Sequence, residues 1–589
     1  MLPAIGAPLL ATGLLSTAPS PDPAQRASVA EALVAEPLLS TRGIVVTSSE
    51  VASRAGARML AEGGNAVDAA VAAAFALSAA DPSESGLGGE TWLLLQPVGR
   101  SAVAIACQAR VPKKADAATL RASLDLRGQG GHATAAAPTT VATLARALSR
   151  YGTKSFADVL APAIEEAERG WTVGWYEASV YGAVAPKLTL SPLLGPVLYP
   201  GACGPSGWPA PVVAGDRVRL PALARTLRRL AEAGPGDFYT GRIASEIEED
   251  MRLNGGFVTR SDLAVVPGLV REEEPIRAPY RDREILAVGA TTGGRVLLET
   301  MQVLAAFPPV AAKSGATADS AQLLLDAIRI AREEVRAPRG ARTAATPFGL
   351  PGAGAASASR RAREIRLGVA WNAASIATPP PPAGKTGGTT QVSVVDALGN
   401  AVSLTQTLGD DWGSGAATES LGFPYNSALR GLRLDDPSDP SYLRPDASLH
   451  APAAPVIVLR EGTVEMVLGS GGSSRTVPAI ASVLRNVVDG GMSLADAVSA
   501  PRVLWQDEPG ARRLIAEAAP PVTKEVLLEL RRRGYVEQYV VAEPESALVS
   551  FGGVNSVRWN AAANAWEGVG DPRRRGVAAA PGRASPSPR

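Results

Sequence analysis

The feature that most constrains the fold is a pair of apolar runs joined by a short turn at residues 391–407. QVSVVD and AVSLTQT alternate with a period of two, and the ALGN between them has the composition of a tight turn. PVIVLR and VEMVLGS, at 455–470, form a second such pair around the turn EGT. The last third of the chain is therefore predicted to contain two antiparallel β-hairpins.

The earlier part of the chain has helical patterns. Residues 48–80 indicate helix, break and helix, with Gly63–Gly64 ending the first helix and Asn65 capping the second. Helical spacing returns at 220–233 and 320–334. Strands near both ends with helical blocks between them predict an α/β sandwich whose central sheets are covered by helices.

Charge and hydropathy exclude several classes of function. The 589 residues include 58 basic and 57 acidic side chains, for a formal net charge of +1, and 46% of residues are hydrophobic. A nucleic-acid or acidic-polymer partner would need a basic surplus, so neither is expected. After the apolar N-terminus, no stretch of about twenty apolar residues free of charge occurs, so a membrane span is not expected either. The apolar N-terminus has no Lys or Arg before its apolar run, which makes it a weak signal peptide.

Histidine and cysteine are scarce. The two histidines, His132 and His450, are too few for a His-ligated metal site, and neither lies in a motif typical of a catalytic triad. We expect no metal and no cofactor, and a general base other than histidine. The two cysteines, Cys107 and Cys203, are predicted to be buried thiols rather than a disulfide.

Composition suggests where the ordered regions end. Residues 337–388 are rich in Pro, Gly, Ala and Ser, with four consecutive prolines at 379–382, which predicts an exposed linker. Residues 1–40 are interpreted as a leader or extension, and 580–589 as a disordered tail.

The segment that carries chemistry is KTGGTTQVSV, where two glycines precede two threonines at the start of a strand. Glycine can adopt the strained backbone that would let the Thr389 hydroxyl attack the Gly388 carbonyl. Cleavage at Gly388–Thr389 would free an α-amine, with a reference pKa of about 8, beside that hydroxyl as its general base. The alternative is that GGTT is only a flexible lead-in to a strand.

A second glycine-rich segment, GSGGSSR at 469–475, lies between a predicted strand and a predicted helix. Backbone N–H groups in such a loop point toward whatever lies above the helix N-terminus, and an oxyanion hole needs such donors. The alternative is an ordinary glycine-rich connection.

Seven motifs occur in an order that resembles the γ-glutamyltranspeptidase family: GGNAVDAAVAAAFAL, DPSESGLGG, YGTKSFADVLAPAIEEAERG, GGFVTRSDL, GGTTQVSVVDALGNAVSLTQT, GSGGSSR and MSLADAVSAPR. The resemblance covers roughly residues 41–579. It implies a four-layer αββα sandwich of the Ntn-hydrolase type, made as one precursor. Cleavage would give a large subunit (41–388) and a small subunit (389–579) that stay together as a heterodimer.

The resemblance also implies residue roles. Thr389 matches the family nucleophile, and Thr407 matches the threonine that hydrogen-bonds it. Thr390 is the second member of the threonine pair. Gly472 and Ser473 stand where the family has two glycines whose N–H groups bind the oxyanion, and the backbone donor survives the change to serine.

The residues that would recognise a glutamyl group differ from the family pattern. Gln108 stands where the family has an arginine that grips the α-carboxylate, and Arg110, two residues on, is a candidate substitute. The family aspartate that binds the α-amino group falls near Arg430 or Gly431. The other changed positions are Gly409 and Ala451–Pro452. The substrate-binding candidates are Gln108, Arg110, Thr390 and Gly471.

Three functions stay open at this point. The family resemblance implies a γ-glutamyltransferase or glutathione hydrolase that acts on a small-molecule amide. The altered recognition residues also allow an amidase or acylase of another amide, and a third alternative is a non-catalytic family member. Family members are commonly exported to the periplasm or beyond, but the weak leader leaves a cytoplasmic location open.

Overall fold

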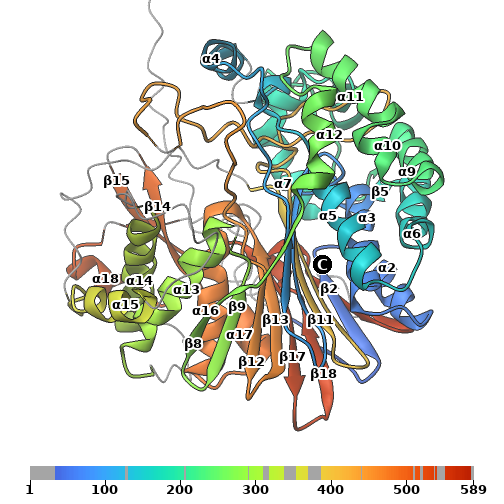
Figure 1. Ribbon diagram of the computed structural model, residues 1–589. Helices are drawn as coiled ribbons and strands as arrows, with labels where there is room; N and C mark the ends of the chain where they lie inside the picture. The colour runs from blue at the N-terminus through green and yellow to red at the C-terminus, as the bar shows by residue number, and fades with distance from the viewer. Residues whose placement is uncertain are drawn as a thin grey trace, which may run out of the picture.

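The computed structural model describes most of the chain, and Figure 1 shows it as a ribbon. The described residues are 34–584 except 127–129, 205–206, 290, 310–316, 337–352, 369–386, 440, 509–510, 518–521, 536 and 540–550.

Two large antiparallel sheets lie face to face at the centre of the molecule (Figure 1). In order across the first, eight-stranded sheet lie β20 (Arg583–Ala584), β19 (Val577–Ala580), β2 (Gly43–Thr47), β10 (Thr389–Asp396), β11 (Ala401–Thr407), β3 (Glu90–Gln96), β4 (Val103–Ala106) and β7 (Arg271–Glu273). In order across the second, seven-stranded sheet lie β1 (Leu38–Ser40), β18 (Ala565–Val569), β17 (Gly553–Asn560), β13 (Thr463–Gly471), β12 (Val456–Arg460), β9 (Arg283–Ala287) and β8 (Ile276–Tyr280).

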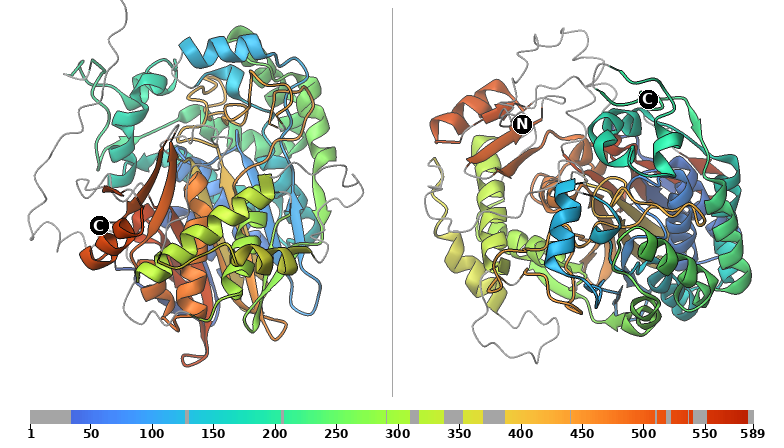
Figure 2. Two further views of the ribbon diagram at one scale, coloured as in Figure 1. Left: turned by 90° about the vertical axis from the view of Figure 1, so that its left-hand side faces the viewer. Right: turned by 90° about the horizontal axis from the view of Figure 1, so that it is seen from above.

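Helices cover the outer face of each sheet, which gives the four-layer αββα arrangement (Figures 1 and 2). The helices that pack on the eight-stranded sheet are α2 (Glu50–Ala61), α3 (Ala66–Ala80) and α5 (Thr140–Tyr151), with α6 (Phe156–Arg169) and α9 (Pro221–Ala233) outside them. The helices on the side of the seven-stranded sheet, in front in the left view of Figure 2, are α13 (Thr292–Ala305), α14 (Ala318–Arg336), α15 (Ala353–Ala362), α16 (Thr476–Val488) and α17 (Leu494–Ser499).

Smaller elements complete the two sides. The remaining helices are α4 (Ala117–Leu126), α7 (Trp175–Leu188), α8 (Leu194–Leu198), α10 (Gly236–Tyr239), α11 (Arg242–Leu253), α12 (Arg260–Leu269) and α18 (Lys524–Arg532). Two further small sheets are made by β14 (Val503–Glu508), β15 (Ala511–Ala516) and β16 (Glu537–Tyr539), and by β5 (Trp171–Thr172) and β6 (Arg217–Val218). In the part of the chain that the structure describes, no helix is long and apolar enough to cross a membrane.

Helix α3 shows why this sequence favours a covered sheet. All fifteen of its residues are buried, so its alanine-rich composition has no polar face, as expected of a helix enclosed on every side. Asn65 accepts hydrogen bonds from the backbone N–H groups of Val67 and Asp68, and Asp68 completes a capping box. The predicted cap, break and buried helix are confirmed.

Three expectations about the chain's extremities and linker need correction. Part of the predicted linker is helical, because Ala358, Ala362 and Ile365 of α15 and the turn after it are buried in the core beside α13 and α14. The predicted tail begins too early, since β19 and β20 pair through residue 584. The predicted leader extends too far, since β1 at residues 38–40 pairs with β18. Residues 1–33, 369–386 and 585–589 lie outside the described residues.

The two cysteines also differ from the prediction. Cys107 is a buried free thiol at the end of β4, where burial raises its pKa to about 12. Cys203 is a free thiol too, but it is exposed, because it lies in the irregular segment between α8 and β6 rather than in a core element.

Candidate active site

Thr389 begins β10 in the middle of the eight-stranded sheet. It lies directly opposite Thr407 of β11, and Thr407 lies directly opposite Glu90 of β3. Directly opposed residues on neighbouring strands project from the same face of a sheet. On these strands that face looks toward the seven-stranded sheet, since Val395 and Trp92, which alternate in phase with Thr389 and Glu90, belong to the core between the sheets.

The two threonine hydroxyls form a directed hydrogen-bond chain. The Thr389 and Thr407 Oγ1 atoms are 2.8 Å apart, and Thr407 Oγ1 donates to the Gly388 carbonyl at 2.5 Å. A hydroxyl has one proton, so Thr389 must be the donor to Thr407. The Gly409 N–H also donates to Thr407 Oγ1, at 2.8 Å. The Thr389 hydroxyl proton is therefore connected, through Thr407, to the carbonyl oxygen of the residue before it.

The Gly388 carbonyl has a second donor. The Leu408 N–H lies 3.0 Å from its oxygen. Two donors thus polarise the carbonyl that precedes Thr389, which is the arrangement that stabilises a developing oxyanion. Both donors come from the end of β11 and not from the glycine-rich loop at Gly472 and Ser473.

The loop that follows β13 lies over Gly387, two residues before Thr389. A Cβ placed on Gly387 would be 2.9 Å from the Ser473 nitrogen and 2.9 Å from the Gly472 carbonyl carbon. Gly472 has a φ of 120° and Ser473 a φ of 54°, and the loop leads through a turn of 3₁₀-helix into α16. The structure therefore brings Gly472 and Ser473 close to the chain at Thr389, with Gly387 beneath them.

Glycine is required at two positions by close approach of the backbone. A Cβ on Gly388 would lie 2.2 Å from the Asp410 carbonyl oxygen, and one on Gly471 would lie 2.1 Å from the Thr389 carbonyl oxygen. Gly388 is not among the residues with a positive φ. The strained backbone expected at Gly388 is therefore not found. Glycine is needed there for another reason, because the 410–411 backbone leaves no room for a Cβ.

A polar network between the two sheets supports β10, the strand that begins with Thr389. The Gln391 side chain accepts from Thr405 at 2.7 Å and donates to Ser403 at 2.9 Å. Asn555 of the facing sheet donates to the Gln391 carbonyl at 3.2 Å, and a Cβ on Gly469 would collide with the Gln391 amide. Gln391 is two residues from Thr389, so this network holds the start of β10 in place against the facing sheet.

A buried ion pair holds the chain just before Thr389. Arg574 Nη1 lies 2.9 Å from Glu84 Oε1 and 3.0 Å from the Gly387 carbonyl oxygen, and both side chains are almost wholly buried. Burial raises the pKa of Glu84 well above its usual value, against the opposing effect of Arg574. Burial alone would lower the pKa of Arg574, but the charge of Glu84 and its neighbours raises it. No local pattern in the sequence points to this pair, whose members are 490 residues apart.

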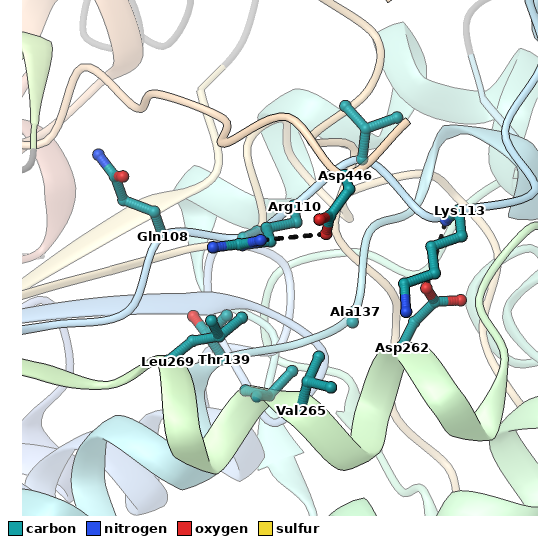
Figure 3. A pocket seen from close by; sticks show the side chains of 12 residues that line it. Gln108, Arg110, Lys113, Ala137, Thr139, Asp262, Val265, Leu269 and Asp446 are labelled. Carbon is teal, nitrogen blue, oxygen red and sulfur yellow. Dashed lines mark hydrogen bonds and ion pairs between the residues drawn. The ribbon is translucent and has the colours of Figure 1, made fainter. Parts of the chain in front are cut away.

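The candidate substrate residues on the β4 side lie at a small recess between the segment after β4 and helix α12 (Figure 3). Arg110 and Asp446 point toward one another across it and form an ion pair of 3.1 Å. Gln108 Nε2 lies 3.3 Å from His450 Nδ1. Arg110 is therefore neutralised by a side chain of the same recess.

The remaining candidates, Arg430 and Thr390, lie apart from the recess and from each other. Arg430 pairs with Asp410 at 2.5 Å, and Asp410 also accepts from Ser427 at 3.0 Å. The Thr390 hydroxyl contacts the Gln406 carbonyl at 3.4 Å within the sheet. Successive residues of a strand project to opposite faces, so Thr390 faces the helices and its side chain does not join Thr389. No group of three or more His, Cys, Asp or Glu residues in the described ranges could hold a metal ion.

Comparisons with known proteins identify the family of the chain. The family model described as gamma-glutamyltranspeptidase matches residues 52–581. The acylase ACY 1 proenzyme of Pseudomonas sp. (strain V22) is 32% identical over 537 residues, which cover 89% of this chain and 91% of that protein. The glutathione hydrolase proenzyme of Escherichia coli (strain K12) is 28% identical over 576 residues, which cover 92% and 94%.

A solved structure has the same fold. The cephalosporin acylase of Bacillus halodurans superposes with a TM-score of 0.75 at 24% identity, over 92% of this chain and 97% of that one. The sheet order, the position of Thr389 and these matches lead to one conclusion: the chain belongs to the γ-glutamyltranspeptidase family of Ntn-hydrolase enzymes.

Proposed function

We propose that this chain is a precursor that cleaves its own Gly388–Thr389 bond and then uses Thr389 to hydrolyse or transfer the acyl group of a small amide. The observation that carries the proposal is the hydrogen-bond chain from the Thr389 hydroxyl through Thr407 to the Gly388 carbonyl. The relatives named proenzymes support it.

Self-cleavage follows from that geometry. The Thr389 Oγ attacks the Gly388 carbonyl carbon while its proton passes to Thr407 and the proton of Thr407 passes to the carbonyl oxygen, which the Leu408 N–H also stabilises. The C–N bond then breaks as that proton moves from the oxygen to the departing nitrogen, and an ester links Gly388 to Thr389. Water hydrolyses the ester, which leaves a Gly388 carboxylate, a free Thr389 hydroxyl and a new α-amine.

Turnover would use the same threonine. The α-amine takes the proton as the Thr389 hydroxyl attacks the amide carbonyl of the substrate. Departure of the new C-terminus, Gly387–Gly388, opens the space beneath the Gly472–Ser473 loop, whose N–H groups then serve the substrate's oxyanion. The amine product leaves with that proton, and water or an acceptor amine releases the acyl group from Thr389.

We further propose that the preferred acyl group is not γ-glutamyl. A zwitterionic acyl group needs a cation for its carboxylate and an anion for its ammonium, because unpaired buried charges are costly. Gln108 is neutral, Arg110 pairs with Asp446, and Arg430 pairs with Asp410. The relative named acylase supports this proposal, and glutathione hydrolysis is the second candidate function.

Incubation of the purified chain tests the self-cleavage. We expect two fragments, one of about two-thirds and one of about one-third of the mass, with the smaller beginning TTQVSV. Thr389→Ala should stay whole, and Thr389→Ser should cleave slowly. A folded wild-type chain that stays intact, or an alanine variant that cleaves normally, would remove the mechanism.

An amide panel tests the acyl group. We expect kcat/KM for glutathione below about 10⁴ M⁻¹s⁻¹ and a higher value for an amide whose acyl group lacks the zwitterion. Gln108→Arg alone should not restore glutamyl activity, since Gly409, Ala451 and Pro452 would still stand where the family has polar recognition residues. Efficient glutathione hydrolysis by the wild-type enzyme would favour the second candidate function.

A further inference from the structure

Glu90 occupies the third place in the row that begins with the nucleophile. Thr389, Thr407 and Glu90 are consecutive cross-strand partners on three neighbouring strands, and all three project from the face between the two sheets. Glu90 is 6% exposed. A carboxyl group is therefore buried one strand beyond the threonine that hydrogen-bonds the nucleophile.

The row continues toward the recess of Figure 3. Trp92 of β3 lies opposite Ala106 of β4, so the same register continued by two residues places Gln108 opposite Glu90. The backbone N–H of Ala109 acts to lower the pKa of the Glu90 carboxyl, which agrees with that placement. Gln108 and Ala109 both line the recess. Glu90 thus lies between Thr407 and the wall of the recess.

The strand end that carries Glu90 is held rigidly. The Gly89 carbonyl accepts from the backbone N–H groups of Thr139 and Thr140, at 2.9 and 3.2 Å. A Cβ on Gly89 would lie 2.4 Å from the Thr407 carbonyl oxygen, so this backbone is pressed against β11. A group held in this way is preorganised to contact a molecule bound at Thr389.

Glu90 differs from Glu84, another buried carboxylate near Thr389, in lacking a cation. Glu84 pairs with Arg574, whereas Glu90 takes part in no ion pair among the described residues. Arg110, on the segment that follows β4, already pairs with Asp446. A buried carboxylate without a cation is costly to the fold, and such a cost is typical of a residue that meets its partner in a ligand.

We propose that Glu90 is a specificity-determining residue of the acyl pocket, which binds an ammonium or N–H donor on the acyl chain and rejects an acyl chain that ends in a carboxylate. The inference rests on the proposed function, because it takes Thr389 as the acylated residue. Beyond the proposed function, the inference specifies the charge of the preferred acyl group.

Three p-nitroanilides of equal chain length test this polarity: 5-aminopentanoyl, pentanoyl and glutaryl, which are cationic, neutral and anionic. We expect cleaved wild-type enzyme at about pH 8 to prefer the aminopentanoyl over the glutaryl amide at least about tenfold in kcat/KM. In Glu90→Gln that preference should fall by about tenfold or more. Mass spectrometry of the small fragment shows in each case whether Thr389 is acylated.

Glu273→Gln is a matched control. Glu273 lies in β7 of the same sheet, beyond β4, and burial raises its pKa too, but it is remote from the row of Thr389. Its substitution should leave the aminopentanoyl-to-glutaryl ratio unchanged. Completion of self-cleavage shows that each variant has folded.

The outcomes separate the two proposals. A wild-type preference for the glutaryl amide overturns the inference without need of any variant, as does an unchanged ratio in Glu90→Gln. If the cleaved wild-type enzyme is acylated by none of the three amides nor by glutathione, the proposed function fails, and the inference fails with it.

Discussion

The nucleophile corner and the acyl side of this site are built in different ways. In the nucleophile corner, formed by Gly388, Thr389, Thr407 and Gly471, backbone atoms approach so closely that a Cβ would not fit at either glycine. On the acyl side, formed by Glu90, Gln108, Arg110 and Arg430, long side chains define the surface, and both arginines pair with a neighbouring aspartate. The chemistry is therefore fixed by the fold, whereas recognition can change through single side chains.

The largest effect should come from filling the space at the nucleophile corner. In Gly388→Ala the new Cβ would lie 2.2 Å from the Asp410 carbonyl oxygen, so the backbone must shift next to the bond that we propose is cleaved. We expect self-cleavage to be lost, or slowed at least about a hundredfold, as followed on a denaturing gel. Gly431→Ala is the control, because no atom lies within 4 Å of a Cβ there. Normal cleavage of Gly388→Ala would show that the corner is as adaptable as the acyl side.

The next largest effect should follow from Arg574→Gln. This change leaves the Glu84 carboxylate buried without its cation and removes a donor to the Gly387 carbonyl. We expect a loss of about 3–5 kcal/mol in the free energy of unfolding and slower self-cleavage. The double variant Glu84→Gln/Arg574→Gln should recover part of the stability. Urea unfolding in the uncleaved Thr389→Ala background measures the stability of the single and the double variant. A loss of stability no larger than that of an exposed ion pair would contradict the account.

Thr407→Ala should have a smaller effect, because it removes one hydrogen bond from the corner without adding an atom. Losing the donor to the Gly388 carbonyl should raise the barrier to cleavage by about 1.5–3 kcal/mol, or roughly 10- to 150-fold in rate. Thr407→Ser keeps the hydroxyl and should stay close to wild type. A serine variant as slow as the alanine variant would assign the effect to the lost methyl group instead.

The smallest effect belongs to the acyl side and depends on pH. Burial raises the pKa of Glu90 to about 7, above its value in the unfolded chain, so folding takes up a proton at this group. Its contribution to stability is present below about pH 4.5 and is lost as the pH rises through about 7. Glu90→Gln lacks that loss and should be more stable than the parent above pH 7, by about 1–3 kcal/mol. Unfolding curves at several pH values in the Thr389→Ala background measure the difference, and a difference independent of pH would contradict a buried ionised Glu90.

Local patterns predicted most of the nucleophile corner. The alternation of residues 391–407 predicted the hairpin that places Thr389 opposite Thr407, and the glycine loop before α16 could be read from GSGGSSR. Glu90 could not be recognised in the same way, because its position depends on β3 lying next to β11, more than 300 residues away in the chain. Composition misled at α15, where alanines in a linker-like sequence pack into a core.

The order of strands around residue 388 bears on how long such an enzyme lasts. In the eight-stranded sheet, β10 and β11 lie between β2 and β3, so segments from before and after the scissile bond are interleaved. A chain folds into this sheet while it is continuous, and a nick then leaves two pieces hydrogen-bonded as one. Rejoining after unfolding would be a meeting of two separate chains, each with open strand edges prone to aggregation. Self-cleavage would thus make unfolding irreversible. The time for which the enzyme stays active would then depend on its rate of unfolding and not on a folding equilibrium.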